Sequence, residues 1–562
     1  MKSADNKIRK PRHLLTVLVE DYFHVGAFET LIQQRNWENF EPRYEQNTLK
    51  TLDLLDEFDT KATFFILGWI AEQNADLVRE IAARGHEVAS RGYYHRSVRQ
   101  LSPEEFRDDI ARATDVLSDA SGQRIVGYRA AEKLNYERDG WIVTPLSDAG
   151  YKYDASFLPT RSSRAEQRVA HRMDAGDGIW EFPYSTRNMG VGLLPISGGN
   201  YFRQIPYTLM RFAVRAWGET TEEPFVSYFH VWELDPEQPR ISAASKYNRI
   251  RHYRKLDKME WILRENLSAY DCVSIADHLG LGERSLRAEQ AEAAEEISVV
   301  PATRTRDLTP ITIGIPCYNE TEALPYLANT LRSVERTLTD AGYSANFIFV
   351  DDHSKDNTLE LLHELFDGRP NTRIISHEQN LGVAAAIMTA IKAAETEIVA
   401  SMDCDCTYDP HELARMLPLL EKDCALVTAS PYHKQGGVRN VPGWRLFLSK
   451  GASALYRAVL NQKLATYTSC FRVYRRSSFE GLEIDESGFL GVAEMLGRID
   501  LDGGRIVEFP AVLEVRLFGF SKMKTAATIV GHLKLLAKLA KLRFFRKSAA
   551  IRPSIALEEE TR

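Results

Sequence analysis

A long charged stretch divides this chain into two parts, and that division limits what it can fold into. Residues 281–309, "LGERSLRAEQAEAAEEISVVPATRTRDLT", carry charge, Ala and Thr with little apolar periodicity. The 562 residues of the chain also exceed the roughly 250–300 residues that one core accommodates. We therefore expect an interdomain linker at 281–309, domains over 10–280 and 310–520, and a distinct tail over 521–562.

Both parts have the sequence pattern of α/β domains. In the first part, short apolar runs such as "ATFFILGW" alternate with helical stretches, for example 43–58, 70–84 and 103–121. This alternation predicts a mostly parallel sheet or barrel covered by helices. The second part opens with "ITIGIPCYNE" and continues as a βαβαβ series. Its strands end in acidic or polar residues, at the position where open α/β sheets bind ligands.

Charge and cysteine usage narrow the classes of function. The net charge of −7 gives no general reason to bind nucleic acid, so we expect no nucleic-acid partner. The six cysteines lack the spacing of a disulfide framework, which predicts a reducing, cytoplasmic location. With no signal-peptide core before Glu20 and no run of about 18 apolar residues, we expect a chain that is not exported and does not span a bilayer.

Two aspartates follow a strand-like run in the second part. Asp403 ends the run "IVASMD" and Asp405 comes two positions later, so both carboxylates are expected at one edge of the sheet. Such a pair can hold a hard divalent cation, Mg²⁺ or Mn²⁺, which neutralises a diphosphate. An isolated pair of this kind is more often a solvated acidic turn, so the assignment depends on the surrounding motifs.

Those motifs occur in one order over roughly two hundred residues. They are "IPCYNE" (315–320), "VDDHSKDNT" (350–358), "NLGVAAAI" (380–387), "MDCDCTYDP" (402–410), "TSCFRVYRR" (468–476) and "FGFSKMK" (518–524). Together they resemble the family 2 inverting glycosyltransferases, particularly the branch that contains dolichol- and polyprenyl-phosphate sugar synthases. The resemblance implies a Rossmann-like domain that binds a nucleotide-sugar.

The same resemblance assigns roles to particular residues of this chain. The nucleotide pocket would be lined by Pro316, Tyr318 and Glu320, with Asp352 hydrogen-bonded to the base. Asp403 and Asp405 would hold the metal and the sugar diphosphate, with Arg516 and Lys522 near the donor or acceptor phosphates. Fixed cations there would stabilise a leaving diphosphate. Glu494 matches an acidic position that orients the acceptor, and a helix-surface carboxylate is the competing interpretation.

One departure from this family concerns the acceptor. The phosphate-sugar synthases commonly have Gly-Ser-Arg after the next strand, whereas this chain has "TASPYHKQGG" with Pro431 at the Arg position. Arg439 and Arg445 are candidates to supply the missing charge. A phosphate acceptor is already ionised and needs little help from a base, whereas a sugar hydroxyl needs one. The acceptor can therefore be a polyprenyl phosphate or a glycan.

The tail has the pattern of an amphipathic helix. Residues 522–547 contain eight Lys or Arg and no Asp or Glu. Apolar residues recur at steps of three and four and Lys residues on another face, namely Ile529, Leu533, Leu536, Ala540 and Phe544 against Lys534, Lys538 and Lys541. This pattern is typical of a helix on an anionic membrane surface. The alternative is a helix docked on the transferase with a solvated basic face.

Four stretches of the first part form a recognisable series, namely "VEDYFHV" (19–25), "KATFFILGWIAE" (61–72), "GYRA" (127–130) and "YFHVWELDPEQPRI" (228–241). With them the first part resembles the polysaccharide deacetylases, most closely the subgroup found in bacterial exopolysaccharide loci. The resemblance implies a deformed (β/α) barrel. It also implies a site in which an acidic residue and two His hold a divalent metal, an Asp is the general base and a late-strand His is the general acid.

This chain departs from that site at three positions. Leu18 stands where the first Asp is expected, Arg91 replaces the first His before His95, and Ala131 replaces a Pro. A guanidinium has no lone pair to donate, so Arg91 cannot ligate a metal. The residues that remain are Glu20 or Asp21, His95, Arg129 and His230. They are too few for a catalytic zinc site, and we expect Arg91 to pair with Glu20 or Asp21 instead.

These observations predict a glycosyltransferase at the inner face of the cell membrane. It would move sugar from a nucleotide-sugar to a lipid-phosphate or glycan acceptor during exopolysaccharide synthesis. Its deacetylase-like domain would lack hydrolase activity and bind or position the glycan. One alternative is a bifunctional enzyme that also deacetylates N-acetyl sugars through an unusual metal site. Another is a scaffold whose two domains bind carbohydrate without turnover.

Overall fold

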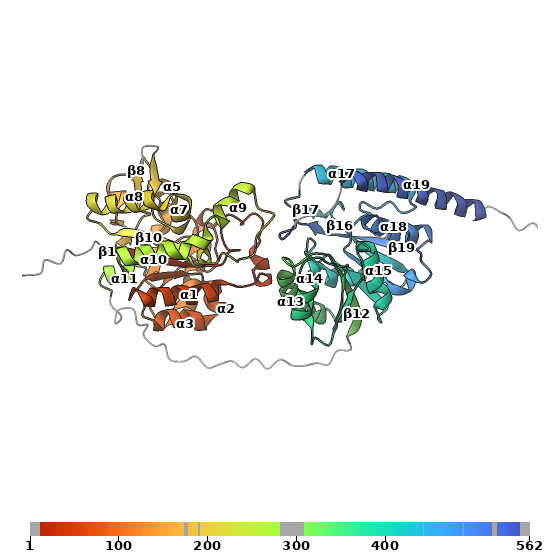
Figure 1. Cartoon of the computed structure of the whole chain (residues 1–562), viewed down its shortest axis with the longest axis horizontal. Helices are drawn as coiled ribbons and strands as arrows, with labels where there is room; N and C mark the ends of the chain where they lie inside the picture. The colour runs from red at the N-terminus through yellow and green to blue at the C-terminus, as the bar shows by residue number, and fades with distance from the viewer. Residues whose placement is uncertain are drawn as a thin grey trace, which may run out of the picture. The chain divides into compact units, whose positions relative to one another are not determined.

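The computed structural model describes residues 12–173, 178–188, 192–281, 308–441, 443–486, 488–519 and 525–550 (Figure 1). The chain forms two compact units. The first comprises Met1–Gln33, Pro42–Pro239 and Ala244–Val299, and the second comprises Gln34–Glu41, Arg240–Ala243 and Val300–Arg562. Nearly all of the predicted linker at 281–309 lies outside the described residues. None of the helices in the described ranges has the length and apolar character needed to cross a bilayer.

The first unit is built on one long, mostly parallel sheet. Its strand order is β10-β1-β2-β3-β4-β5-β7-β6, with β11 also paired to β1. The strands are β1 (Arg12–Val19), β2 (Thr63–Ile66), β3 (Glu87–Ser90), β4 (Gly127–Tyr128), β5 (Tyr153–Asp154), β6 (His171–Met173), β7 (Ile179–Glu181), β10 (Phe225–His230) and β11 (Asp271–Val273). Pairing the late strand β10 with the first strand curls the sheet. The predicted barrel-like deacetylase fold is confirmed.

Helices cover the outside of this curled sheet, and its central strands are buried on both faces. Every residue of β2 and β3 is buried, as expected for parallel strands between two packed layers. The covering helices include α1 (Tyr44–Glu57), α3 (Ala75–Ala83) and α4 (Pro103–Ser121). Ser102 and Glu105 form a capping box at the start of α4, and Gly122 ends the helix at φ 66°.

The second unit contains a seven-stranded sheet of order β14-β13-β12-β15-β18-β16-β19. Its strands are β12 (Thr309–Cys317), β13 (Tyr343–Asp351), β14 (Thr372–Ser376), β15 (Ile398–Ser401), β16 (Cys424–Ser430), β18 (Arg472–Arg475) and β19 (Arg505–Pro510). Only β18 in this sheet is antiparallel to its neighbours. Strands β13 and β14 lie on one side of β12 and β15 lies on the other, which makes the reversal of strand order typical of a Rossmann-like domain. This predicted fold is also confirmed.

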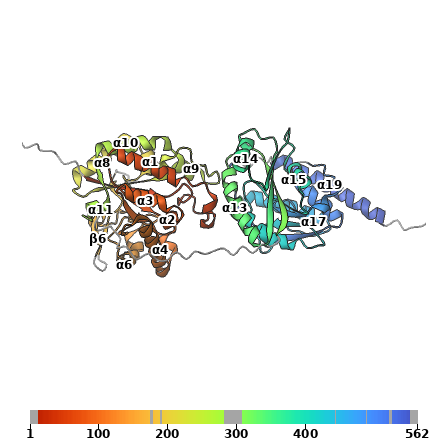
Figure 2. The same ribbon diagram turned by 90° about the horizontal axis from the view of Figure 1, so that it is seen from below.

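Helices pack on both faces of the second sheet. Figure 2 shows α13 (Leu324–Asp340) and α14 (Thr358–Phe366) on one side and α15 (Val383–Ala393) on the other. Separate buried clusters occupy the two faces, one with Leu327 against Ile313 and the other with Ile387 against Val350. The helix α18 (Phe489–Leu501) belongs to the second cluster.

The predicted C-terminal helix is present as α19 (Thr525–Ala550), which packs on α17 (Gly443–Val459) and α18. Leu535, Leu536 and Leu539 are buried against the unit. Ile529, Leu533 and Phe544 stay exposed at 42%, 53% and 73%. The apolar residues predicted to share one face are therefore divided, because Leu536 packs against the second unit while the others do not.

A close helix contact in the second unit gives a test of this packing. A Cβ atom on Gly491 of α18 would lie 1.9 Å from the Glu486 carbonyl oxygen and 2.6 Å from the Ala384 Cβ. We expect Gly491→Ala to lower the free energy of unfolding by about 1–3 kcal/mol through overpacking. Gly451→Ala, at an exposed position in α17 with open space around it, should be neutral or stabilising by up to about 1 kcal/mol. Denaturant unfolding of both variants measures the difference, and equal stabilities would contradict the packing.

Candidate functional site

Carboxylates gather at one edge of the second sheet. Strands β12, β13 and β15 are parallel, and Cys317 at the end of β12 lies opposite Asp351 at the end of β13. Pro316, Tyr318 and Glu320 come from the end of β12 and the loop after it, all partly exposed. Asp403 and Asp405 follow β15 in the same direction. The fold therefore brings the residues predicted to line the donor site to a common edge.

Asp403 is a buried carboxyl group that lies beside a second carboxylate, that of Asp405. Burial, together with the neighbouring charge of Asp405, raises the pKa of Asp403 to about 7. A carboxyl group in such a place is stabilised by a cation, and Asp oxygens are the ligands that Mg²⁺ and Mn²⁺ prefer. The two residues thus fit the predicted divalent cation.

A guanidinium already lies beside this pair. Arg516 approaches Asp405 with 3.5 Å between Nη1 and Oδ2, and it also forms an ion pair with Glu320. Its Nε donates to the carbonyl oxygen of Phe518 at 2.7 Å, which fixes the side chain. Arg516 is therefore a cation of the chain itself that lies beside the carboxylates of Asp405 and Glu320.

The carboxylate of Asp352 already has hydrogen-bond partners within the second unit. It accepts hydrogen bonds from the backbone N–H groups of Leu381 and Gly382 at 2.8 and 2.7 Å, and Oδ1 lies 2.8 Å from Nδ1 of His377. These contacts hold the loop that leads into α15. His377 was not identified from the sequence, although its position after the apolar run "TRIIS" is a usable signal because strand ends form the site.

Glu494 is not a helix-surface carboxylate, since it is fully buried. Its Oε2 accepts from the backbone amides of Asp485 and Glu486 at 3.1 and 2.8 Å. Its Oε1 accepts from Arg498 and from Lys538 of α19, each at 2.8 Å. Nε of Arg498 donates a further hydrogen bond to Oε1. The carboxylate of Glu494 thus accepts five hydrogen bonds, whereas a carboxylate has about four lone pairs. Glu494 thus joins the loop before α18 to α19, which rules out the helix-surface interpretation, and its role in orienting the acceptor stays a prediction.

The remaining predicted cations are placed only in part. Arg439 is half-exposed, with Nη1 at 3.5 Å from Oε1 of Glu514. The side chain of Arg445 and all of Lys522 lie outside the described residues. Pro431 directly follows the end of β16. Arg439 pairs with Glu514, whose backbone amide donates to Thr407 in the turn after Asp405, so Arg439 stays a candidate for the missing charge.

The equivalent site of the first unit is centred on one buried ion pair. Arg91, just after β3, donates from Nε to Oε2 of Glu20, just after β1, at 2.8 Å. Only 3% and 1% of the two side chains are exposed. The Arg91 guanidinium also donates to the carbonyl oxygens of Ala130 and Ala131 at 3.2 and 3.4 Å. The expected pairing of Arg91 with an acidic residue is present, and its partner is Glu20.

Two histidines complete this cluster. His95 Nε2 lies 3.3 Å from Oε2 of Glu20, and His230 Nδ1 lies 2.5 Å from Oε1. Burial alone would raise the pKa of Glu20, but the charges of Arg91, His230 and His95 prevail and hold it well below its usual range. Glu20 is thus an anion surrounded by donors, with the guanidinium among them.

Asp21, the other candidate partner, faces away from this cluster. Its carboxylate accepts from the backbone N–H groups of Tyr22, Arg43 and Tyr44 at 2.8, 2.5 and 2.8 Å. Burial raises the pKa of Asp21 to about 7. Asp21 therefore shapes the loops around the site and does not pair with Arg91.

Leu18 leaves an apolar side chain where the general base is expected. It is buried and lies between Phe65 and His230 on the neighbouring strands. Arg129 lies with its guanidinium carbon 4.5 Å from the ring centres of both Tyr184 and Tyr228. In the part of the chain that the structure describes, no three His, Cys, Asp or Glu side chains are arranged to hold a metal ion. The arrangement in the first unit does not fit zinc.

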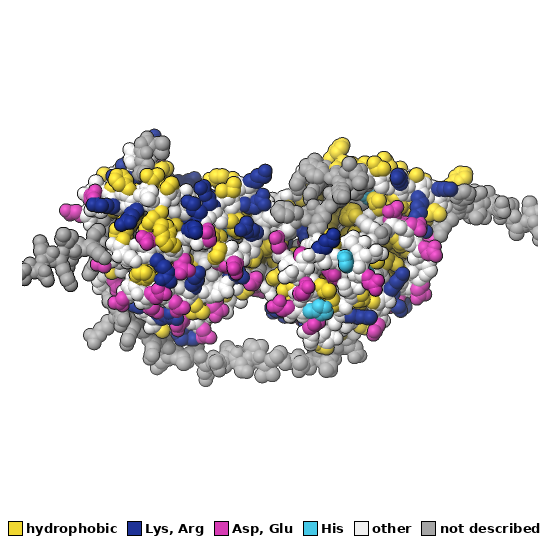
Figure 3. Space-filling model, in the orientation of Figure 1, with side chains coloured by type: hydrophobic (Ala, Val, Ile, Leu, Met, Phe, Trp, Pro, Cys, Tyr) yellow, Lys and Arg dark blue, Asp and Glu magenta, His cyan; other side chains and the backbone are white. Residues whose placement is uncertain are grey.

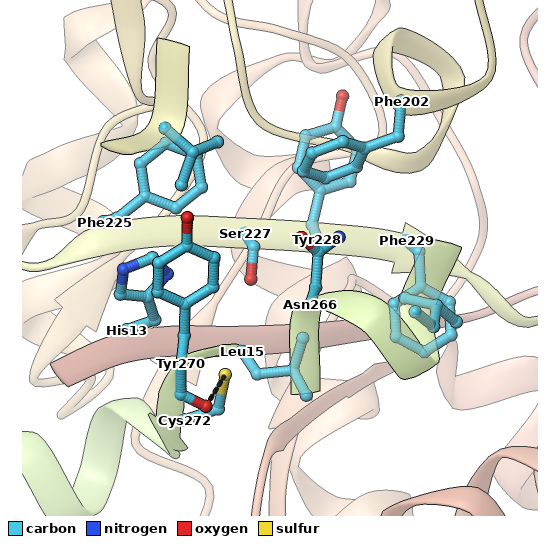
Figure 4. Close-up of a pocket in the computed structure, with 12 residues that line it drawn as sticks. His13, Leu15, Phe202, Phe225, Ser227, Tyr228, Phe229, Asn266, Tyr270 and Cys272 are labelled. Carbon is cyan, nitrogen blue, oxygen red and sulfur yellow. Dashed lines mark hydrogen bonds between the residues drawn. The ribbon is translucent and has the colours of Figure 1, made fainter. Parts of the chain in front are cut away.

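A small enclosed cavity also lies in the first unit, between β1, β10 and the helices α8 (Tyr207–Thr220) and α10 (Met259–Ala269) (Figure 4). His13 borders it and stacks on Tyr270 at 4.1 Å between ring centres, and burial lowers the pKa of His13 to about 4. A volume of about 30 Å³ holds little more than water. This cavity is too small for a sugar.

Family models match both units. Residues 312–482 match glycosyl transferase family 2, residues 35–153 match polysaccharide deacetylase, and residues 155–279 match a domain of unknown function, DUF3473. The last match covers β10 and so contributes His230 to the cluster around Glu20.

Characterised relatives match the second unit. Polyprenol monophosphomannose synthase of Mycolicibacterium smegmatis is 30% identical over 249 residues, which cover 43% of this chain and 88% of that protein. Dolichol-phosphate mannosyltransferase of Pyrococcus furiosus is 28% identical over 233 residues, covering 41% of this chain but only 64% of its own length.

Among solved structures, one similar chain is glucosyl-3-phosphoglycerate synthase of Mycobacterium tuberculosis in complex with Mn²⁺ and uridine-diphosphate. It is 18% identical to this chain, with a TM-score of 0.32. That alignment covers 42% of this chain and 80% of that one. The sequence matches, rather than this likeness, establish the relationship: the chain belongs to glycosyl transferase family 2 through its second unit, which is fused to a polysaccharide deacetylase-like domain.

Proposed function

We propose that the second unit transfers a sugar from a nucleotide-sugar to a polyprenyl phosphate. The observation that carries this proposal is the pair Asp403 and Asp405 at the strand ends, with the pKa of Asp403 raised to about 7 and Arg516 beside it. The names of the two relatives, a polyprenol monophosphomannose synthase and a dolichol-phosphate mannosyltransferase, support a lipid-phosphate acceptor. A glycan acceptor is the second possibility, because Pro431 stands where those synthases commonly carry an arginine.

Different residues of the site would bind the metal ion, the phosphates and the nucleotide during such a transfer. Asp403 and Asp405 would hold Mg²⁺ or Mn²⁺, which supplies positive charge to the donor diphosphate. Arg516 is positioned to donate hydrogen bonds to phosphate oxygens and to stabilise the charge that develops on the leaving group. Pro316, Tyr318 and Glu320 would border the nucleotide, and Asp352 holds the adjoining loop. An ionised acceptor phosphate needs no dedicated base, which agrees with the saturation of Glu494.

The first unit is proposed to bind or position glycan without hydrolysing it. Arg91 fills the place of a metal ligand, its charge is matched by Glu20, and Leu18 supplies no base. Acetyl removal by this family's chemistry needs both the Lewis acid and the base.

Membrane association is proposed to place the enzyme near a lipid acceptor. Exposed Ile529, Leu533 and Phe544 of α19 lie on a helix with Lys534 and further basic residues, as in helices that bind anionic bilayers. The protein would then be peripheral at the inner face of the cell membrane and serve exopolysaccharide assembly.

If the second unit is a transferase, its activity should depend on a divalent metal and should fall when one of the two carboxylates is replaced. With Mn²⁺, a panel of nucleotide-sugars and a short polyprenyl phosphate, Asp405→Asn should lower kcat on the order of 10²–10³-fold, because charge stabilisation of the leaving diphosphate is lost. Asp423→Asn, at a position whose side chain is 69% exposed, should retain activity. Nucleotide release and lipid-linked sugar are the two readouts. Equal activity of both variants, or turnover unaffected by chelation, would count against the assignment.

The deacetylase-like unit gives a second prediction. The full chain should bind no zinc in this unit and release no acetate from N-acetylated oligosaccharides. Leu18→Asp/Arg91→His supplies a base and a third ligand beside Glu20 and His95, so we expect it to bind one zinc per chain. Leu18→Asp alone keeps the guanidinium in place and should bind none. Metal analysis and acetate release test this pair, and acetate release by the unchanged chain would establish the bifunctional alternative.

A further inference from the structure

Large apolar side chains are exposed together on the first unit, within the region that matches DUF3473. Leu209 and Phe212 of α8 are 50% and 65% exposed. On α9 (Lys246–Tyr253), Tyr247 and Ile250 are 71% and 61% exposed, and Trp261 of α10 is 49% exposed. Single exposed apolar residues are ordinary, but a group on three helices that all contact α7 (Gly199–Gln204) marks an interaction site.

The same region is strongly basic. Residues 246–258 contain six Lys or Arg and one Asp, in a chain whose net charge is −7. Arg251, Arg254 and Lys258 are exposed. Figure 3 shows basic and apolar side chains side by side on this face, over α8, α9 and α10. Figure 2 shows these three helices along one edge of the unit, with α4 at the opposite edge. Positive charge is therefore concentrated where the apolar side chains are exposed.

Buried contacts hold these helices in place. Arg203 of α7 (Gly199–Gln204) forms a fully buried ion pair with Glu233 at 2.8 Å. Its Nη1 also donates to the carbonyl oxygens of His252 and Arg254 at 2.8 and 2.7 Å, at the end of α9. On the outer side, the rings of Tyr207 and Trp261 pack at 4.9 Å between α8 and α10. The surface is thus preformed.

We propose that this face docks on an anionic lipid bilayer. The docking surface is defined by Phe212, Ile250 and Trp261 with Arg251, Arg254 and Lys258. Aromatic and aliphatic side chains insert at the boundary between headgroups and acyl chains, while nearby cations bind anionic headgroups. The exposed aliphatic residues Leu209 and Ile250 favour lipid over a glycan, because sugar hydroxyls are recognised by polar groups and aromatic faces.

This inference does not rest on the proposed membrane contact of α19, which belongs to the other unit. Charge-based attraction also predicts that binding weakens with salt.

Vesicle co-sedimentation of the full chain tests the docking surface. We expect binding to vesicles of phosphatidylglycerol and phosphatidylcholine but not to phosphatidylcholine alone. The variant Arg251→Ala/Arg254→Ala/Lys258→Ala should bind on the order of 100-fold more weakly, since each cation near the surface contributes to attraction. Phe212→Ser/Ile250→Ser should also bind more weakly. The control Arg79→Ala/Arg107→Ala/Arg124→Ala removes the same charge from exposed positions on α3 and near α4 and should bind like the unchanged chain.

The outcomes separate this surface from α19. Leu533→Ser/Phe544→Ser in the same assay reports on α19 alone, so either contact can fail while the other stands. Unchanged binding of the Arg251, Arg254 and Lys258 variant would overturn the docking surface, as would an equal loss in the control. Retention on a soluble acidic polysaccharide, with no vesicle binding, would instead assign the face to a glycan.

Discussion

The chemistry of the first unit depends on the buried ion pair between Arg91 and Glu20. Removing either partner would leave an uncompensated charge in the interior, at a cost of about 3–5 kcal/mol, so the two residues constrain each other. The guanidinium also spans to the carbonyls of Ala130 and Ala131, which ties the ends of three strands together. The guanidinium of Arg91 has no lone pair, so it cannot act as a metal ligand at this centre.

The second unit also places carboxylates beside a guanidinium, but there the negative charges outnumber the positive one. Asp403 and Asp405 are like charges held close together, and the nearby Arg516 is partly exposed at 21%, whereas Arg91 is fixed at 3%. One centre is neutralised within the fold, and the other keeps an excess of negative charge at an accessible edge. This difference in electrostatic balance explains why we assign turnover to the second unit and only recognition to the first.

The order of elements and the strand-end acids could be predicted from the sequence, because both follow from local periodicity and from the rule that parallel strands share an edge. What could not be predicted were partners set by distant segments. Glu20 and Asp21 are adjacent, and only the fold turns one to Arg91 and the other to the amides near Arg43. Glu494 pairs with Lys538, which lies 44 residues further along the chain. Leu536, which was predicted to share an exposed apolar face with Leu533, is buried instead.

The contact of Arg516 with Asp405 would make binding of the proposed ligands an exchange of partners. A divalent cation held by Asp405 would compete with the guanidinium for the same oxygen, while a donor diphosphate would offer that guanidinium new oxygens. Binding of either ligand would then lower the free-energy cost of binding the other. By thermodynamic linkage, metal and donor should each raise the affinity of the site for the other by the same factor.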